Sequence, residues 1–152
     1  SVEVSNMVSQ CTVLKPTIPL LRFSEEIFNS SNIDSVDFVL DQVENFRSSA
    51  SFNHLFGFNL IEFITDKEAL MKSISHNLKQ GGYVHLSYRY PSPGNYLTKL
   101  TLAMTFGLNF RIFSHSEIVT LLEDNGFSVV DGLRQVPTGK GSIAFLIAQK
   151  IK

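Results

Sequence analysis

Residues 58–88 read FNLIEFITDKEALMKSISHNLKQGGYVHLSY, and this stretch decides the fold. Residues 58–64 are short, mostly apolar and rich in strand-forming types, so they predict a β-strand. Residues 83–88 have the same character and predict a second strand. A strand, a helix and a second strand at this spacing form a β-α-β unit, whose crossover makes the two strands parallel.

A helix is predicted between these two strands. Leu70, Ile74 and Leu78 recur every four residues and make one apolar face. Thr65 and Glu68 have the spacing of a capping box, in which side chains satisfy the free backbone N–H groups at the start of a helix. Gly81 can adopt the left-handed conformation that ends a helix, so we expect the helix to stop there.

The C-terminal part of the chain repeats this kind of pattern. Residues 114–117 form a second capping box, and Asn125-Gly126 ends the helix that follows it. Residues 127–130 and 143–148 then predict two strands. No helix fits between them, so we expect these strands to be antiparallel neighbours. A further helix is predicted over residues 97–106.

The N-terminal part is less regular. Residues 2–4, 20–23 and 36–40 are strand candidates. Ser24 is expected to be the N-cap of a helix that follows the second of these strands. Residues 7–15 show no clean periodicity, so no helix is assigned to them.

Length and composition indicate one globular domain over residues 1–152. The apolar runs close to both ends lead us to expect that it is either cut from a longer chain or the ordered part of one. Hydrophobic residues make up 43% of the sequence and charged residues 18%, which argues against disorder. The net charge of -1 provides no bulk positive field that would attract nucleic acid or an anionic membrane. The sequence holds no apolar run long enough to span a bilayer and no signal peptide.

Cysteine and histidine usage narrows the chemistry further. The single cysteine, Cys11, excludes an intrachain disulfide and a cysteine-rich metal site, and it favours a reducing, cytoplasmic location. The four histidines lack the spacing of metal ligands, so no metal site is predicted.

The order of these motifs resembles the class I S-adenosylmethionine (SAM)-dependent methyltransferases. Residues 78–84, LKQGGYV, are similar to the family's L-K-P-G-G turn into its fifth strand, with Gln80 in place of the proline. Residues 113–118 and 121–130 resemble its F-S-x-E-E-L and L-L-E-x-A-G-F-x-V-V segments, and Phe58-Asn59 resembles the F-D opening of its fourth strand. The resemblance implies an α/β Rossmann-like fold. Its mostly parallel seven-stranded sheet has the order 3-2-1-4-5-7-6, with the last strand antiparallel.

The resemblance places the first cofactor motif at residues 3–9, EVSNMVS. Family members have E/D-x-G-x-G-x-G there, because glycines let the backbone approach the methionine part of SAM without a Cβ clash. Glu3 matches the acidic residue. Three other residues stand where the glycines belong: Ser5, Met7 and Ser9.

The second strand of the family ends in an acid that accepts hydrogen bonds from the ribose hydroxyls, in a D-x-S-x-x-M frame. Residues 22–27 fit this frame with Ser24 in place, but Arg22 replaces the acid, and an arginine cannot accept a hydrogen bond. In an alternative alignment, residues 2–4 are the second strand and Glu3 is the ribose acid. The first motif would then lie upstream of this chain.

The remaining cofactor residues follow the third and fourth strands. Residues 41–45, DQVEN, resemble the D-A/V-x-x-L segment whose acid contacts the adenine. The resemblance therefore implies cofactor contacts by three residues of this segment and by two at the end of the fourth strand: Asp41, Gln42, Val43, Glu62 and Phe63.

Three residues are candidates for a catalytic role. Methyl transfer from a sulfonium needs positioning and sometimes a base, so no strict catalytic signature is expected. Glu62 occupies a position that often faces the reacting methyl group in the family. Tyr88 follows the fifth strand at the edge where open α/β sheets bind ligands. His115 lies where the family places its substrates, although its capping turn gives it an alternative role at the helix start.

Two functions are compatible with these features. The first is a methyltransferase-like domain with a degraded SAM site, which acts as a non-catalytic scaffold or interaction module for other domains of a longer chain or for a protein partner. The second is an active SAM-dependent methyltransferase that acts on a small molecule.

Overall fold

The computed structural model describes residues 11–31, 36–106, 110–138 and 141–152. The chain divides into two compact units, residues 1–46 and 47–152. The expected strand at residues 2–4 lies outside the described residues.

The first unit contains β1 (Cys11–Lys15), α2 (Ile18–Ser30) and β2 (Val36–Leu40). The two strands are parallel, and their register runs from Cys11 opposite Val36 to Lys15 opposite Leu40. Helix α2 packs its buried Phe28 edge-to-face against Phe38 of β2, with the ring centroids 5.6 Å apart. A strand–helix–parallel strand arrangement therefore forms here.

Two predictions for this unit are wrong. Residues 20–23 belong to α2 and not to a strand, because Pro19 lies in the first turn of the helix, where a missing N–H is tolerated. Ser24 is consequently inside the helix, where its hydroxyl donates to the Leu20 carbonyl at 2.9 Å, and it is not the N-cap. Residues 11–15, which showed no helical periodicity, form a strand.

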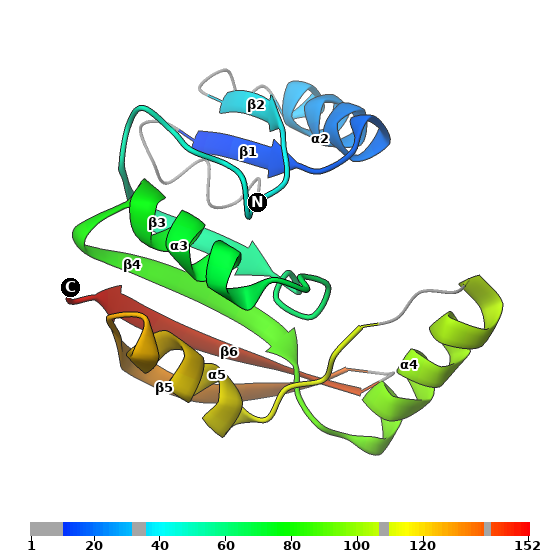
Figure 1. The fold of residues 1–152 in the computed structure, drawn as a ribbon. Coiled ribbons are helices and arrows are strands. Elements are labelled where there is room, and N and C mark those ends of the chain that lie inside the picture. Colours follow the sequence, from blue (N-terminus) through cyan, green and yellow to red (C-terminus); the bar gives the residue numbers. More distant parts are fainter. Residues whose placement is uncertain (1–10, 32–35, 107–109, 139–140) are drawn as a thin grey trace. The chain divides into compact units, whose positions relative to one another are not determined.

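The described residues of the second unit form four strands and three helices, which Figure 1 labels. They are β3 (Phe52–Phe58), α3 (Lys67–Asn77), β4 (Leu78–Arg89), α4 (Pro93–Phe106), α5 (His115–Asp124), β5 (Phe127–Thr138) and β6 (Gly141–Lys150). The strand order is β3-β4-β6-β5. Strands β3 and β4 are parallel, whereas β6 is antiparallel to both of its neighbours.

Helices α3 and α5 lie on the same face of this sheet (Figure 1). On that face, β4 and β6 bury paired residues such as Val84 opposite Ala148 and Leu86 opposite Leu146. Ile74 of α3 and Leu122 of α5 are fully buried in the same core. This core of apolar side chains between one sheet face and two helices holds the second unit together.

The helix predictions for the second unit hold with shifted boundaries. The N-cap of α3 is Asp66, whose carboxylate accepts from the Ala69 N–H at 2.9 Å, and not Thr65. The helix ends at Asn77, before Gly81. Gly81 does adopt the left-handed conformation, with φ +74°, but it does so inside β4 at an irregularity in the pairing with β3.

The fourth strand of the family pattern lies six residues earlier than predicted. Strand β3 begins at Phe52-Asn53, whereas the prediction began at Phe58-Asn59. The described residues form six strands in two sheets, and not one seven-stranded sheet. The order β3-β4-β6-β5 agrees with the 4-5-7-6 part of the expected sheet, and the antiparallel last strand is confirmed.

Candidate functional site

The carboxyl ends of β3 and β4 meet at one edge of the second sheet, and Asn59 shapes this edge. Its φ of 48° is in the left-handed region, which asparagine tolerates better than most residues. Its N–H donates to the Ser87 carbonyl at 3.0 Å and lies 3.1 Å from the Ser87 hydroxyl. The chain then leaves the sheet, so the residues that follow can place side chains over the strand ends.

Glu62 extends the strand pairing with its side chain. In a parallel ladder, the N–H of Arg89 would donate to a carbonyl of β3. Instead it donates to Oε1 of Glu62 at 2.6 Å. The Glu62 side chain is only 3% exposed, and burial raises the pKa of its carboxyl. Hydrogen bonds from the N–H groups of Glu62 and Arg89, and the charges of Arg89 and Lys67, act in the opposite direction.

Two cations, Lys67 and Arg89, act on this carboxyl, and two aromatic rings lie close to Arg89. Lys67 donates from its ammonium to the carbonyls of Ile61, at 2.6 Å, and of Ile64, which fixes the turn around Glu62. The guanidinium of Arg89 lies 5.1 Å from the centroid of the Phe110 ring. Phe63 is half exposed, and its ring centroid is 5.7 Å from that of Phe110.

Tyr88 and His115 form a hydrogen-bonded pair at the same edge. The Tyr88 hydroxyl lies 2.8 Å from Nδ1 of His115. Tyr88 is fully buried, and burial raises its pKa to about 12, with Tyr90 acting in the same direction. The phenol is therefore neutral near pH 7 and holds the imidazole in one orientation.

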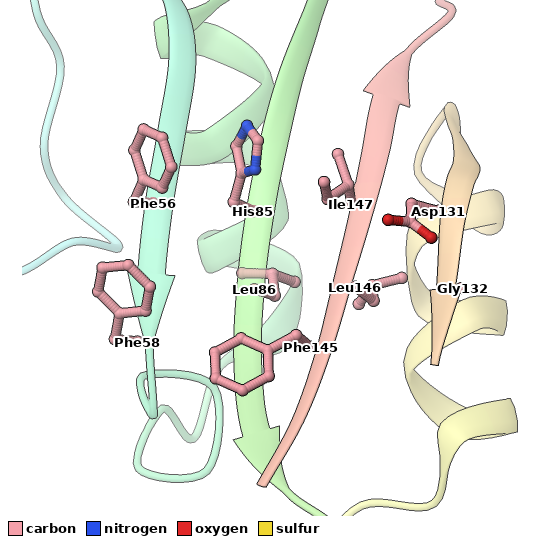
Figure 2. Close-up of a pocket in the computed structure, with 9 residues that line it drawn as sticks. All are labelled: Phe56, Phe58, His85, Leu86, Asp131, Gly132, Phe145, Leu146 and Ile147. Carbon is pink, nitrogen blue, oxygen red and sulfur yellow. The ribbon is translucent and has the colours of Figure 1, made fainter. Parts of the chain in front are cut away.

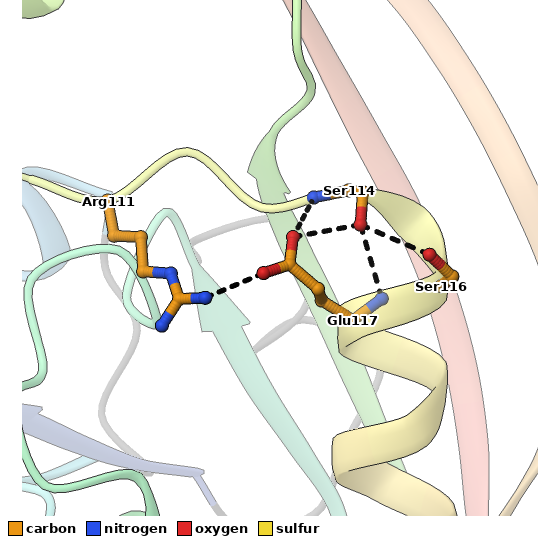
Figure 3. A network of polar contacts seen from close by, with 4 residues as sticks. All are labelled: Arg111, Ser114, Ser116 and Glu117. Carbon is orange, nitrogen blue, oxygen red and sulfur yellow. Dashed lines mark hydrogen bonds and ion pairs between the residues drawn. The ribbon is translucent and has the colours of Figure 1, made fainter.

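The start of α5 fixes the position of His115 (Figure 3). The Ser114 side chain accepts from the Glu117 N–H, and the Glu117 carboxylate accepts from the Ser114 N–H at 2.8 Å. Arg111 donates to the other Glu117 oxygen at 2.6 Å. The predicted capping box is confirmed, and it anchors the segment that carries His115.

The structure thus brings four of the predicted site residues to one edge: Glu62, Phe63, Tyr88 and His115. Arg89 and Asn59, which sequence reasoning did not assign to the cofactor or to catalysis, belong to the same edge. The only sequence signal for Arg89 was its place directly after a predicted strand.

The other predicted cofactor residues belong to the first unit or lie outside the described residues. Asp41 directly follows β2, its N–H donates to the Lys15 carbonyl at 3.1 Å, and its Oδ1 accepts from the Gln42 N–H at 2.7 Å. Val43 lies in the turn that follows. Ser24 is inside α2, away from any strand end. Glu3, Ser5 and Met7 lie outside the described residues.

The opposite face of the second sheet carries a shallow hollow of about 290 Å³ (Figure 2). Phe56, Phe58, Phe145 and Ile147 contribute apolar side chains to it, and His85 lies between them. His54, one row further along the sheet, lies with its Nδ1 3.0 Å from Nε2 of His85. Neither cofactor motifs nor catalytic candidates from the sequence fall on this face.

Among the residues that the structure describes, no three His, Cys, Asp or Glu side chains are grouped closely enough to hold a metal ion. Within the same residues, no helix is long and apolar enough to cross a membrane.

No protein-family model and no curated protein sequence matches this chain. Solved structures do match it. A SAM-dependent methyltransferase from Methanosarcina mazei has a TM-score of 0.74 at 17% identity, over 98% of this chain and 85% of its own. A second match is magnesium protoporphyrin IX methyltransferase from Synechocystis PCC 6803, solved with bound S-adenosylhomocysteine (SAH). Its TM-score is 0.75 at 14% sequence identity, and the match covers 99% of this chain and 68% of that one.

A third match comes from the complex between the Haloferax volcanii Trm112 methyltransferase activator and its candidate methyltransferase. It has a TM-score of 0.73 at 12% identity, over 94% of this chain and 73% of that one. At these identities the matches establish the fold. This chain has the Rossmann-like fold of the class I SAM-dependent methyltransferases.

The strands of this chain can be matched to the strand numbers of the family fold by counting back from β3. Because β3-β4-β6-β5 has the order 4-5-7-6, β2 takes the place of the third strand and β1 that of the second. The residue at the end of the second strand is then Lys15, and not Arg22, which lies in α2. Lys15 was missed because residues 11–15 carry no recognisable strand pattern.

Proposed function

We propose that this chain is a non-catalytic methyltransferase-like domain with a degraded SAM site, which serves as a scaffold or interaction module. The observation that carries the proposal is Lys15 at the end of β1, because the second strand of the family ends there in an acid that accepts hydrogen bonds from the ribose of SAM.

The chemistry of Lys15 explains why this position does not fit the cofactor. The ribose hydroxyls need an acceptor, whereas the lysine ammonium has only donors. Arg22, which the sequence alone aligned with the ribose-binding acid, also lacks an acceptor. Asp41 at the end of β2 is the one acid retained at a cofactor position among the described residues of this unit. The residues present therefore do not fit SAM, and no reaction step is assigned to it.

An interaction role is supported by helix α4. It presents a row of exposed apolar side chains: Tyr96, Leu97, Leu100 and Met104. Leu97 is 65% exposed and Met104 78%, and contiguous apolar surface of this kind marks protein-binding sites. The Haloferax complex is a precedent for a protein of this fold that binds another protein.

The second candidate function is an active methyltransferase for a small molecule. It is favoured by the Tyr88–His115 pair at the ligand-binding edge of the sheet. With Nδ1 engaged by Tyr88, Nε2 of His115 is the nitrogen left to take a proton from an acceptor group.

Calorimetric titration with SAM and with SAH separates the two functions. A non-catalytic domain gives no binding heat up to about millimolar ligand, while its circular dichroism shows a folded protein. Binding of either ligand at about micromolar affinity would overturn the proposal in favour of the active enzyme.

A further inference from the structure

Two histidines from neighbouring strands meet on the face of the second sheet opposite α3 and α5. Figure 2 shows His85 of β4 on this face, and His54 of β3 lies beside it, with its Nδ1 3.0 Å from Nε2 of His85. The strand register explains the contact. Phe56 lies opposite His85, and His54 is two residues earlier, so its side chain is on the same face of the sheet. Two ring nitrogens that can each present a lone pair are thus held next to each other.

Both rings can be reached from the solvent. His54 is exposed and His85 is partly exposed. His85 lines the hollow of about 290 Å³, and His54 lines a second hollow of about 130 Å³ that is bordered by residues 79–83. A small ion can therefore approach the pair from open surface.

Neighbouring aromatic rings hold the two imidazoles in position. The ring of His54 stacks on that of Tyr83, with the centroids 5.5 Å apart. The ring of His85 stacks on that of Phe56 at 4.4 Å. Side chains that are already packed in this way lose little freedom when a ligand binds, so the pair is preorganised.

The spacing of the two nitrogens suits one transition-metal ion. Imidazole nitrogen binds first-row ions at about 2.0 Å, so two such ligands lie about 2.8 Å apart at a right angle and about 3.3 Å apart in a tetrahedron. The distance of 3.0 Å falls within this range. Zinc sites use three or four protein ligands, whereas Cu²⁺ has the highest affinity of the divalent first-row ions for a given set of nitrogen ligands. A site with two imidazoles therefore favours Cu²⁺.

We infer that His54 and His85 together bind one Cu²⁺ ion. In the free protein one of the two facing nitrogens carries the proton of their hydrogen bond. When the ion binds, this proton moves to the other nitrogen of the same ring, and both facing nitrogens donate a lone pair to the metal. Among the described residues no third His, Cys, Asp or Glu joins the pair, so water supplies the other ligands.

This inference goes beyond the proposed function, because such a site works without SAM. The sequence predicts no metal site, since the two histidines are 31 positions apart and only the pairing of β3 with β4 brings them together.

Titration of the full chain with Cu²⁺ tests the inference, and electron paramagnetic resonance gives the readout. Saturation at one ion per chain is expected below about 100 µM free Cu²⁺, with a signal coupled to two imidazole nitrogens. Zn²⁺ serves as the second probe and is expected to bind at least about tenfold more weakly. Binding of Zn²⁺ as tight as that of Cu²⁺ would overturn the assignment to copper.

Variants locate the site. His54→Gln and His85→Gln are each expected to weaken Cu²⁺ binding by at least about tenfold and to leave one coupled nitrogen, because one of two metal ligands is lost. His76→Gln, on the exposed surface of α3, is the matched control and should keep the original affinity. Circular dichroism checks that each variant is folded. Absence of saturable binding would overturn the inference, and so would binding that both site variants leave unchanged, since the copper would then be held elsewhere on the chain.

Discussion

At the scale of single residues, short-range side-chain contacts explain how this chain fixes its segments. Ser114 and Glu117 satisfy backbone N–H groups at the start of α5, and Arg111 holds the same carboxylate. These hydrogen bonds favour the charged form and lower the pKa of Glu117, and the one to the Ser114 N–H contributes most. Because they position His115, the capping box matters to the site as well as to the helix.

Replacement of Ser114 by alanine should therefore destabilise the protein by about 1 kcal/mol, the usual effect of losing an N-cap. Ser116 offers a matched control, since its hydroxyl contacts only that of Ser114 among the bonds in Figure 3. Ser116→Ala is expected to change the free energy of unfolding by less than about 0.5 kcal/mol. Urea denaturation of both variants measures the difference, and equal effects would contradict the assigned role of Ser114.

His85 makes the stability of the protein depend on pH. Burial lowers the pKa of His85, and the neighbouring His54 lowers it further. A base with a lowered pKa in the folded state binds fewer protons when folded than when unfolded. The contribution of neutral His85 to the free energy of unfolding is thus complete above the ordinary histidine pKa of about 6.5. It is lost as the pH falls through and below that value.

The free energy of unfolding is therefore expected to fall between neutral and mildly acidic pH, and His85→Gln should flatten that decline. His76, exposed on α3, provides the control, and His76→Gln should keep the decline of the original protein. Urea denaturation at a series of pH values measures both. The same slope in His85→Gln as in the original protein would rule out His85 as its source.

At the scale of elements, signals confined to a few residues predicted the structure better than apolar runs did. The capping box at Ser114 and the glycine after α5 needed only local chemistry, and both are found as predicted. The sequence contains two Phe-Asn pairs, at residues 52–53 and 58–59, and the prediction placed the start of the strand at the second pair. In the structure β3 begins at the first pair, because its polar and exposed residues still pair with β4. This pairing is a tertiary effect that a short sequence pattern does not contain.

The same limit applies to the site. The sequence predicted Glu62, Tyr88 and His115 as site residues, because each was expected at the end of a strand or the start of a helix, and the structure places all three at the same edge of the sheet. It did not reveal that Glu62 would accept from the backbone of Arg89, since the two residues are 27 positions apart. It also misplaced the end of the second strand, because apolar residues 20–23 suit a helix and a strand equally well.

Gly82 tests how tightly β3 and β4 pack where β4 begins. A Cβ there would lie 2.9 Å from the Lys79 carbonyl oxygen and 3.0 Å from that of Asn53, both parts of the backbone. Gly82→Ala is therefore expected to destabilise the protein by about 1–3 kcal/mol. Gly132 in β5 has open space around it, so Gly132→Ala should be close to neutral. Thermal unfolding measures the melting temperatures of both variants, and we expect the lower value for Gly82→Ala. Similar melting temperatures would contradict close packing at Gly82.

At the scale of the whole molecule, the residues that build the fold and those that would bind the cofactor are different. The buried core of residues 47–152 comes from α3, α5, β4 and β6, and it requires no ligand. The residues that would define a SAM site lie largely in residues 1–46. Mutations there can therefore change cofactor binding without cost to the core.

Restoring one cofactor residue should consequently fail to restore binding. Lys15→Asp returns an acceptor to the end of β1, but it supplies a single contact to the cofactor. A single hydrogen bond to a charged group contributes about 1.5–3 kcal/mol, whereas even micromolar affinity requires about 8 kcal/mol. We therefore expect no SAM binding by calorimetry in Lys15→Asp, with Arg22→Asp in α2 as the control and circular dichroism to confirm folding. Micromolar binding by Lys15→Asp alone would contradict this expectation and would mean that one ammonium blocks an otherwise competent site.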